Sequence, residues 1–263
     1  MTPLTGIPVL WPAPVRVRCL STQRAGGVSE GAWGLAGGAR GGLNLGMHVG
    51  DAALDVQTNR DRLRSVVGVP IQWLEQIHGT RVFNADEAMG QSAEPVSPTP
   101  VADAAVCTQA GRALCIMTAD CLPVLFSDLD GHCIGAAHAG WRGLQAGVLE
   151  ATVCAMRARL GAQAPLLAWL GPAIGPQAFE VGEEVREAFA HHDRNALSAF
   201  ARAKAPGKWL ADLEKLARQR LQACGGIAVY GGGMCTVNDP VRFFSHRRDR
   251  VSGRMASLIW LAR

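Results

Sequence analysis

Short apolar runs bounded by turn residues recur through most of the chain. Two of them, residues 122–126 and 132–137, flank the sequence Asp-Leu-Asp-Gly. A tight turn between two apolar runs is typical of antiparallel strands, so we expect a buried β-hairpin here. Similar runs predict strands at residues 15–21, 71–77, 80–84, 102–108, 113–118, 166–170, 227–230, 241–245 and 255–261.

Apolar residues recur at helical spacing in four other segments. The first begins at Asp55, a candidate N-cap, and ends before Gly68. Its expected buried face carries Val56, Leu63, Val66 and Val67. We expect the other helices at residues 142–160, 182–191 and 209–224, with a flexible connection over residues 195–208.

Glycines crowd residues 26–50, and we expect this segment to be loop throughout. Strands and helices alternate irregularly elsewhere, with hairpins as well as crossovers, which favours the α+β class over a doubly wound sheet. No G-x-G-x-x-G follows a predicted strand, which argues against a dinucleotide-binding fold. The expected architecture is a single domain of mixed β-sheets with flanking helices, spanning residues 1–263.

The composition is that of a globular enzyme, with 48% hydrophobic residues, 18% charged residues and a net charge of +4. The densest basic run, residues 246–250, is short and contains an acid, so nucleic-acid binding is not indicated. Eight cysteines occur without a C-x-x-C pair, which favours reduced thiols over a disulfide framework. No signal peptide or membrane-length apolar run is evident, so we expect a cytoplasmic protein without membrane partners.

The predicted hairpin brings a thiol and an imidazole together. Cys121 stands just before its first strand and His138 just after its second, 17 positions later, so the open ends of the hairpin place them side by side. His78 lies at a break between two other predicted strands. Two histidines and one cysteine suit zinc and leave a fourth position for water or substrate.

Two other interpretations of the same residues remain open. Cys121 could act as a nucleophile with His138 as its base and with Asp120 or Asp103 orienting the imidazole. Alternatively, Cys121 is a core thiol and the histidines cap turns. The spacing of these residues does not separate the three interpretations.

Nine sequence blocks follow one another through nearly the whole chain and resemble one family, the laccase-domain family, also called the YfiH or peptidoglycan-editing-factor family. The blocks are TQRAGGVSEG, LNLGMHVGD, NRDRL, WLEQIHGTRV, ADAAVCT, TADCLPVLF, AAHAGWRGL, AWLGPAIGPQAFEVGEEV and FFSHRRDRVSGRMASLIWL. Two positions depart from the family pattern: Gly42 replaces a serine before Leu-Asn-Leu-Gly, and Phe179 replaces a tyrosine. If that serine helps to hold phosphate, one donor is missing in this chain.

The resemblance implies layered mixed α/β structure and a zinc-dependent purine nucleoside phosphorylase that also deaminates adenosine. The implied substrates are phosphate with adenosine, inosine, guanosine or S-methyl-5′-thioadenosine. It also implies one zinc per chain held by His78, Cys121 and His138, the residues already selected at the turns. The older laccase label implies copper, which we disfavour because seven histidines are too few for a multicopper oxidase.

Further candidate residues follow from this expected activity. Asn44 is a candidate for nucleoside binding, and Arg60, Arg142 and Arg247 or Arg248 are candidates for phosphate binding. Asp120 and Gln76 are candidates for orienting a metal ligand, and Asp120 also for receiving a proton. Trp141 and Phe243 are possible stacking surfaces for a base.

Three functions compete with the phosphorylase prediction: a metal-free Cys-His hydrolase or amidase that edits peptidoglycan precursors, a copper-dependent polyphenol oxidase, and a binding protein with a structural zinc. Metal content and a nucleoside substrate screen distinguish them. We expect small-molecule partners only, and a monomer or weak homodimer.

Overall fold

Two mixed β-sheets packed face to face form the centre of the fold. The computed structural model describes residue 4, residues 6–89 and residues 98–262. In spatial order, the first sheet consists of β1 (Gly6–Ile7), β2 (Val17–Thr22), β15 (Met255–Leu261), β7 (Ala113–Thr118) and β4 (Ile71–Gln72). The second consists of β14 (Ile227–Gly231), β10 (Leu166–Leu170), β8 (Leu122–Asp128), β9 (Ile134–Ala139), β6 (Ala104–Cys107) and β5 (Val82–Asn84).

The second sheet is buried on both faces, as β8 illustrates. Leu122, Val124 and Phe126 pack into a core shared with helices, whereas Leu125 packs against the first sheet. A strand covered on both faces needs apolar residues at every position. This explains why the sequence shows a continuous apolar run here rather than alternation.

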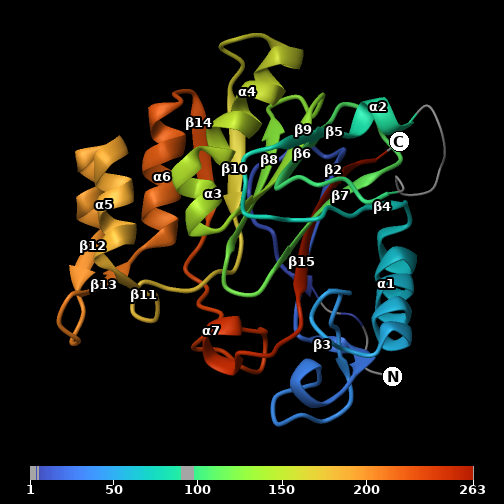
Figure 1. The fold of residues 1–263 in the computed structure, drawn as a ribbon. Helices are drawn as coiled ribbons and strands as arrows, with labels where there is room; N and C mark the ends of the chain where they lie inside the picture. The colour runs from blue at the N-terminus through green and yellow to red at the C-terminus, as the bar shows by residue number, and fades with distance from the viewer. Residues whose placement is uncertain (1–3, 5, 90–97, 263) are drawn as a thin grey trace.

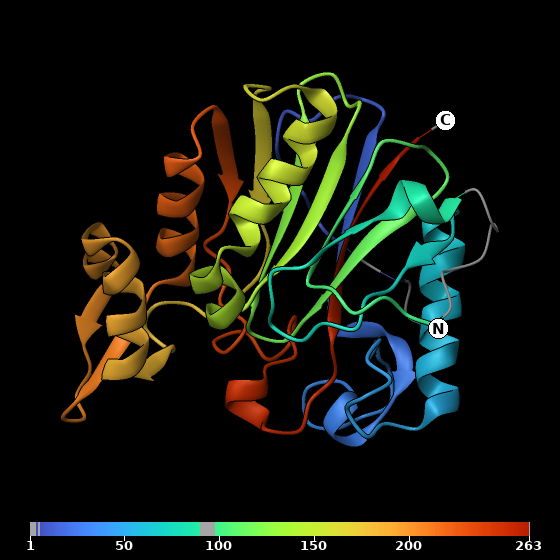
Figure 2. The same cartoon turned by 45° about the horizontal axis from the view of Figure 1, so that its top comes forward.

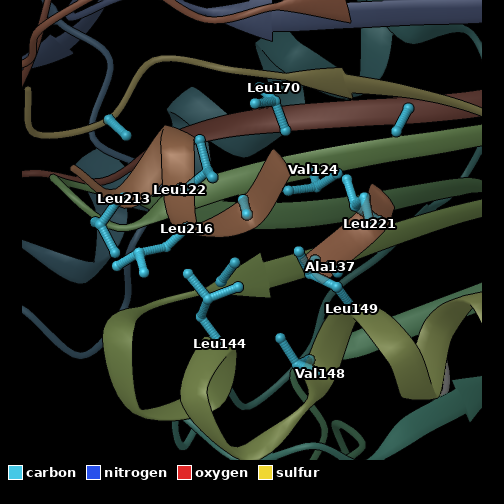
Figure 3. Close-up of a cluster of buried hydrophobic side chains, with 14 of the residues drawn as sticks. Leu122, Val124, Ala137, Leu144, Val148, Leu149, Leu170, Leu213, Leu216 and Leu221 are labelled. Carbon is cyan, nitrogen blue, oxygen red and sulfur yellow. The ribbon is translucent and has the colours of Figure 1, made fainter. Parts of the chain in front are cut away.

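Helices cover the outer faces of both sheets (Figure 1). The second sheet is covered by α3 (Trp141–Ala146), α4 (Val148–Leu160) and α6 (Leu213–Ala223), whose leucines meet those of β8 and β10 in Figure 3. The first sheet is covered by α1 (Ala53–Val67), together with Leu43 and Leu45. The layer order is helix, sheet, sheet, helix, and the predicted α+β class with mixed sheets is confirmed.

A third, small sheet lies to one side of these layers. It has the order β11 (Glu180–Gly182), β13 (Lys208–Ala211) and β12 (Phe200–Arg202), and it packs with α5 (Glu183–His192) and the 3₁₀ helix η2 (Arg194–Ala199). Figure 2 shows this group at the left of the molecule, opposite α1. Residues 195–202, expected to belong to a flexible connection, therefore form regular structure, and residues 203–207 form the turn between β12 and β13.

Several predicted elements are confirmed. The strands at 113–118, 166–170 and 255–261 match β7, β10 and β15, and the hairpin at 122–137 matches β8 and β9. The helix at 182–191 matches α5 within one residue, and the strand at 227–230 matches β14.

The helix predicted over residues 142–160 is wrong in one respect, because Gly147 divides it. Gly147 has a φ of 104° and ends α3 by donating its N–H to the carbonyl oxygens of Gly143 and Leu144. Only glycine adopts this conformation without a steric penalty. The predicted helix over 209–224 is also shorter: residues up to Ala211 belong to β13, and α6 begins after Asp212, whose carboxylate accepts the N–H of Lys215.

The N-terminal half contains three further corrections. The N-cap of α1 is Ala52 rather than Asp55. Val66, expected on the buried face of the helix, is 57% exposed, whereas Asn59 is buried there. The strand predicted over 71–77 is limited to β4, and that over 80–84 begins only at β5. The glycine-rich segment is not all loop, because it contains β3 (Ala25–Ser29) and the 3₁₀ helix η1 (Gly31–Trp33).

Two short helices were not predicted, namely α2 (Ala85–Met89) and α7 (His246–Asp249). Residues 241–245 form turns rather than a strand: Val241 is 70% exposed, while Phe243 and Phe244 are fully buried. Within the described part of the chain, no helix has both the length and the apolar character needed to cross a membrane.

Candidate metal centre

Three segments bring His78, Cys121 and His138 together. His78 occupies the turn between β4 and β5 with a φ of 63°, and Cys121 directly precedes β8. His138 lies inside β9, paired with Pro123, rather than after the strand as predicted. One ligand atom from each residue falls within 4.8 Å of the others, and His78 Nε2 is 3.7 Å from Cys121 Sγ. The hairpin thus brings thiol and imidazole together as expected.

Asp103, just before β6, fixes the orientation of both histidines. Its buried carboxylate lies 2.8 Å from Nδ1 of His138 and accepts the backbone N–H groups of Ile77, His78 and Gly79 at 2.7–3.1 Å. With Nδ1 of His138 directed at this carboxylate, Nε2 is the nitrogen available to a metal or to Cys121. Asp103 therefore fills the orienting role that the sequence analysis offered to either Asp120 or Asp103.

Asp103, Cys121 and His138 shift the pKa values of their neighbours in this group. Burial acts to raise the pKa of Asp103, but hydrogen bonds from His138, Gly79 and His78 hold the pKa below its usual value. Burial likewise acts to raise the pKa of Cys121, yet the imidazoles of His138 and His78 lower it to about 6. Burial lowers the pKa of His138, but Cys121 and Asp103 raise it to about 9. In the absence of metal, the resting state at neutral pH is a thiolate beside an imidazolium.

Other thiols of the chain behave differently. Burial raises the pKa of Cys107, Cys115 and Cys133 to about 12. Only a thiolate is a good metal ligand or nucleophile, so these three cysteines are packing residues. Cys121 differs from them because two imidazoles face it.

The donor set fits a metal with borderline or soft character. One thiolate and two imidazoles suit zinc or copper better than magnesium or calcium, and three protein ligands leave a coordination position for a reactant. A second group of possible ligands, Asp128, Asp130 and His132, lies at the turn of the β8–β9 hairpin. The Asp128 carboxylate there accepts the N–H groups of Asp130 and Cys133, which is the ordinary work of a turn aspartate.

A cavity of about 640 Å³ opens in front of the three residues. Its lining includes Glu75, His48, His246 and Arg254, none of which the sequence analysis selected as a site residue. His48 lies in the family-like block LNLGMHVGD, and His246 and Arg254 lie in the block FFSHRRDRVSGRMASLIWL. The resemblance of these blocks to the family could therefore have identified the three residues.

The part of the cavity lining formed by His48, His246 and Arg254, called the basic wall below, is basic. Burial lowers the pKa of Arg254, while Cys121 and Asp120 act to raise it, and a guanidinium stays charged under all ordinary conditions. Burial, Arg254 and Arg60 together lower the pKa of His48. The cavity thus has metal-type ligands on one side and a cation with two imidazoles on another.

The Asp120 carboxylate makes its hydrogen bonds to the C-terminal segment, away from His78, Cys121 and His138. It has a φ of 91°, and its two carboxylate oxygens accept the hydroxyl of Thr236 and the backbone N–H of Arg247, both at 2.6 Å. Asp120 therefore ties the residue before Cys121 to the start of α7. Gln76 is likewise engaged elsewhere, since its side chain pairs with the backbone of Met117.

The candidate substrate-binding residues are spread over the molecule. Asn44 is fully buried, and its side chain bonds to Gly46, Asp51 and the N–H of Arg254. The guanidinium of Arg60 stacks over Trp73 and donates to the carbonyl of Leu45. Neither side chain is among those that line the cavity, and their hydrogen bonds hold the backbone at Leu45 and Gly46.

The other three arginines also lie outside the large cavity. Arg142 is exposed, with its guanidinium 4.4 Å from the ring centre of Trp141. Arg248 donates to the carbonyls of Thr236, Val237 and Phe243. Arg247 lines a smaller cavity next to Cys121. Phe243, a possible stacking surface by sequence, is fully buried.

Gly140 offers a direct test of the convergence of these side chains. A Cβ atom there would lie 2.7 Å from Cδ2 of His78 and 3.0 Å from Sγ of Cys121. We expect Gly140→Ala to weaken zinc binding by about tenfold or more, as displacement of a ligand-orienting group does. The φ of −63° suits alanine, so the melting temperature of the metal-free protein should change little. Titration against a zinc chelator and thermal unfolding measure both quantities, and unchanged affinity would contradict the geometry.

A family model described as "Multi-copper polyphenol oxidoreductase laccase" matches residues 18–262. The chain belongs to this family. The resemblance inferred from the nine sequence blocks is thereby confirmed. The family's description names copper, and the donor set of His78, Cys121 and His138 is one of two candidate metal-binding groups among the described residues.

Close relatives carry a different description. A purine nucleoside phosphorylase of Pseudomonas aeruginosa is 50% identical over 254 residues, which cover 95% of this chain and 96% of that protein. Purine nucleoside phosphorylase YfiH of Escherichia coli is 47% identical over 255 residues, with the same two shares. The crystal structure of a Neisseria meningitidis protein, 48% identical, aligns with a TM-score of 0.87 and covers 98% of this chain and 99% of that one.

Proposed function

We propose that this chain is a zinc-dependent purine nucleoside phosphorylase. The observation that carries the proposal is the His78, Cys121 and His138 group, which lines a cavity that is also lined by the cation of Arg254. The names of relatives at 47–50% identity support the same reaction class. The proposed substrates are inosine, adenosine, guanosine and S-methyl-5′-thioadenosine, each with inorganic phosphate.

Zinc is the proposed ion because one thiolate and two neutral imidazoles form a typical catalytic zinc set. His78, Cys121 and His138 would hold it, and the ion would supply a Lewis acid with one position open to a reactant. Residues of the chain itself hold the metal ligands in a fixed arrangement. Asp103 holds His138 in one tautomer and positions the His78 backbone, so no ligand has to be reorganised during turnover.

The basic wall fits the phosphate co-substrate. Arg254 provides the positive charge, and the imidazoles of His48 and His246 provide N–H donors at the same cavity. A dianionic nucleophile must be held against the sugar before it can attack C1′, and a preorganised cation lowers the cost of that approach. This wall takes over the role that the sequence analysis gave to Arg60, Arg142 and Arg247.

Deamination of adenosine is a second proposed activity, supported by one carboxylate. Glu75 lines the same cavity as the metal-type ligands. Zinc-dependent deaminases use a glutamate that is not a metal ligand to move protons between the attacking water and the base. Glu75 is the residue proposed for this role, because the carboxylate oxygens of Asp103 and Asp120 already accept hydrogen bonds from other groups.

The decisive experiment is a product assay on the metal-loaded protein. With inosine, we expect hypoxanthine and ribose 1-phosphate when phosphate is present, and no base release without it. Activity should be lost after chelation and return with zinc. Base release that is independent of phosphate would indicate hydrolysis instead, and activity that survives chelation would favour the metal-free Cys-His hydrolase.

Removal of the cation at Arg254 tests the phosphate wall. A charge-assisted hydrogen bond contributes roughly 1.5–3 kcal/mol, so Arg254→Met should raise KM for phosphate by about tenfold or more. KM for inosine should change much less. Arg142→Met, at an exposed position outside the cavity, is the matched control and should leave KM for phosphate unchanged. The reverse pattern would return the phosphate role to Arg142.

A further inference from the structure

A second cavity of about 150 Å³ adjoins the first, and Ala119, Cys121 and His246 line both. Its other walls come from segments far apart in the sequence. Trp141 is the first residue of α3, and Leu213 is the first residue of α6, at the left of Figure 3. The two cavities therefore meet at Cys121 and at the imidazole of His246.

The walls of this second cavity are mainly apolar and partly aromatic. Trp141, Phe179, Ile174 and Leu213 supply them. The Asp120 carboxylate also borders the cavity, but both of its oxygens already accept hydrogen bonds from the protein. Apolar and aromatic walls favour an aromatic ring over a free sugar, whose hydroxyls would lose water there without polar partners.

Cations stand beside the aromatic walls. Arg247 lines the cavity, lies 5.4 Å from the ring centre of Phe179, and is held by the carbonyls of Ala178 and Glu180. Arg250 lines it from an exposed position. An apolar and aromatic lining that also carries guanidinium groups fits an aromatic ring that acquires negative charge.

We propose that this second cavity is the base subsite, which holds the purine ring while ribose and phosphate occupy the larger cavity. The proposal rests on the proposed phosphorylase function and deepens it. Bases bind to proteins by stacking on aromatic and apolar side chains, which the smaller cavity has, whereas the larger cavity has the basic wall suited to phosphate. The glycosidic bond then lies at the junction formed by Cys121 and His246.

This division accounts for the charges of the reaction. An oxygen of hydrogen phosphate forms a bond to C1′, the C1′–N9 bond breaks, and its electron pair moves to N9. The proton of the hydrogen phosphate ends on the departing base. While the bond breaks, negative charge develops on the purine, next to Arg247 and Arg250.

Binding of the two reaction products tests the proposal separately from turnover. Stacking by an aromatic residue is worth a few kcal/mol per base, so Trp141→Ala should weaken hypoxanthine binding by about tenfold. Binding of ribose 1-phosphate should stay within about twofold, since its cavity does not include Trp141. Trp141→Phe should restore hypoxanthine binding. Calorimetric titration of the zinc-loaded protein measures all of these affinities.

A tryptophan outside both cavities serves as the control. Trp209, in the third sheet, lines neither cavity, and Trp209→Ala should leave hypoxanthine binding unchanged. If Trp141→Ala does not fold, Phe179→Leu removes the other aromatic wall and is interpreted in the same way. Equal weakening of both products, or of neither, overturns the base subsite.

The outcomes also separate this proposal from the proposed function. Phosphorolysis of inosine with hypoxanthine binding insensitive to Trp141 and Phe179 would refute the subsite and leave the function in place. Binding of hypoxanthine that depends on these residues, without any phosphorolysis, would refute the function and support the subsite.

Discussion

Substitution of Cys121 by serine is expected to remove both the bound metal and the turnover of nucleosides. The expected loss of activity is roughly a hundredfold or more, at or above the upper end of what weakening a metal site costs. The reason is the ionisation of the ligand. The imidazoles of His138 and His78 lower the pKa of the Cys121 thiol to about 6, so the cysteine presents an anion at neutral pH. A serine hydroxyl stays protonated under these conditions and is a poor ligand.

The pH dependence of metal binding follows from the same group. Below pH 6 the thiol takes up its proton, and protons then compete with the metal, so affinity should fall as the pH drops through that value. The His138 pKa of about 9 acts in the same direction, because the imidazolium must lose a proton before its nitrogen can bind a metal. Metal content of dialysed protein between pH 5 and 8 measures this effect.

Cys154→Ser is the matched control for the cysteine substitution. Cys154 is exposed on α4 and lines neither of the two cavities at the ligand group, and its replacement should leave metal content and activity unchanged. A Cys121→Ser protein that keeps one zinc per chain but loses activity would identify Cys121 as a nucleophile instead of a ligand. Full activity of that variant would remove Cys121 from the site altogether.

The local part of the site could be predicted from the sequence because it is built on one hairpin. The turn Asp-Leu-Asp-Gly and the flanking apolar runs determine the pairing of β8 with β9, and this pairing brings Cys121 and His138 together. His78 stood out for a different reason, as an imidazole at a break between apolar runs. The structure agrees with that break, because His78 has a φ of 63° and is followed by Gly79.

The remainder of the site depends on contacts that no local pattern contains. Asp103 reaches His138 because β6 pairs with β9, 35 positions later in the chain. Asp120 is adjacent to the ligand cysteine, but its carboxylate faces Thr236 and Arg247 in the C-terminal segment. Proximity in the sequence therefore does not show which aspartate contacts His138.

The same limit applies to the fold. The break at Gly147 could be confused with helix interior, because apolar spacing continues on both sides of it and only the backbone angle reveals the turn. The sequence Lys208–Ala211 precedes a helix without a proline or glycine between them, so its assignment to a strand depends on pairing with β11 and β12. The first error comes from the local backbone conformation of one glycine, and the second from tertiary contacts that override local preference.

Asp103→Asn is expected to have the second largest effect, on stability as well as on the site. Asp103 is fully buried, and its two oxygens serve Nδ1 of His138 and three consecutive backbone N–H groups. An asparagine has one acceptor oxygen, and its NH₂ group would face donors rather than acceptors. Breaking a buried charged pair costs about 3 kcal/mol or more, and urea unfolding of the metal-free protein should show a loss of this size.

The effect on the site should exceed a simple loss of stability. Without the carboxylate, His138 loses one of the partners that raise its pKa, and the ring is no longer held with Nδ1 directed inward. Zinc affinity should fall roughly ten- to a hundredfold, as for other residues that orient a metal ligand. Asp61→Asn, on the exposed side of α1, is the control and should change stability by less than about 0.5 kcal/mol. A destabilised Asp103→Asn protein with unchanged zinc affinity would limit Asp103 to a structural role in the β4–β5 turn.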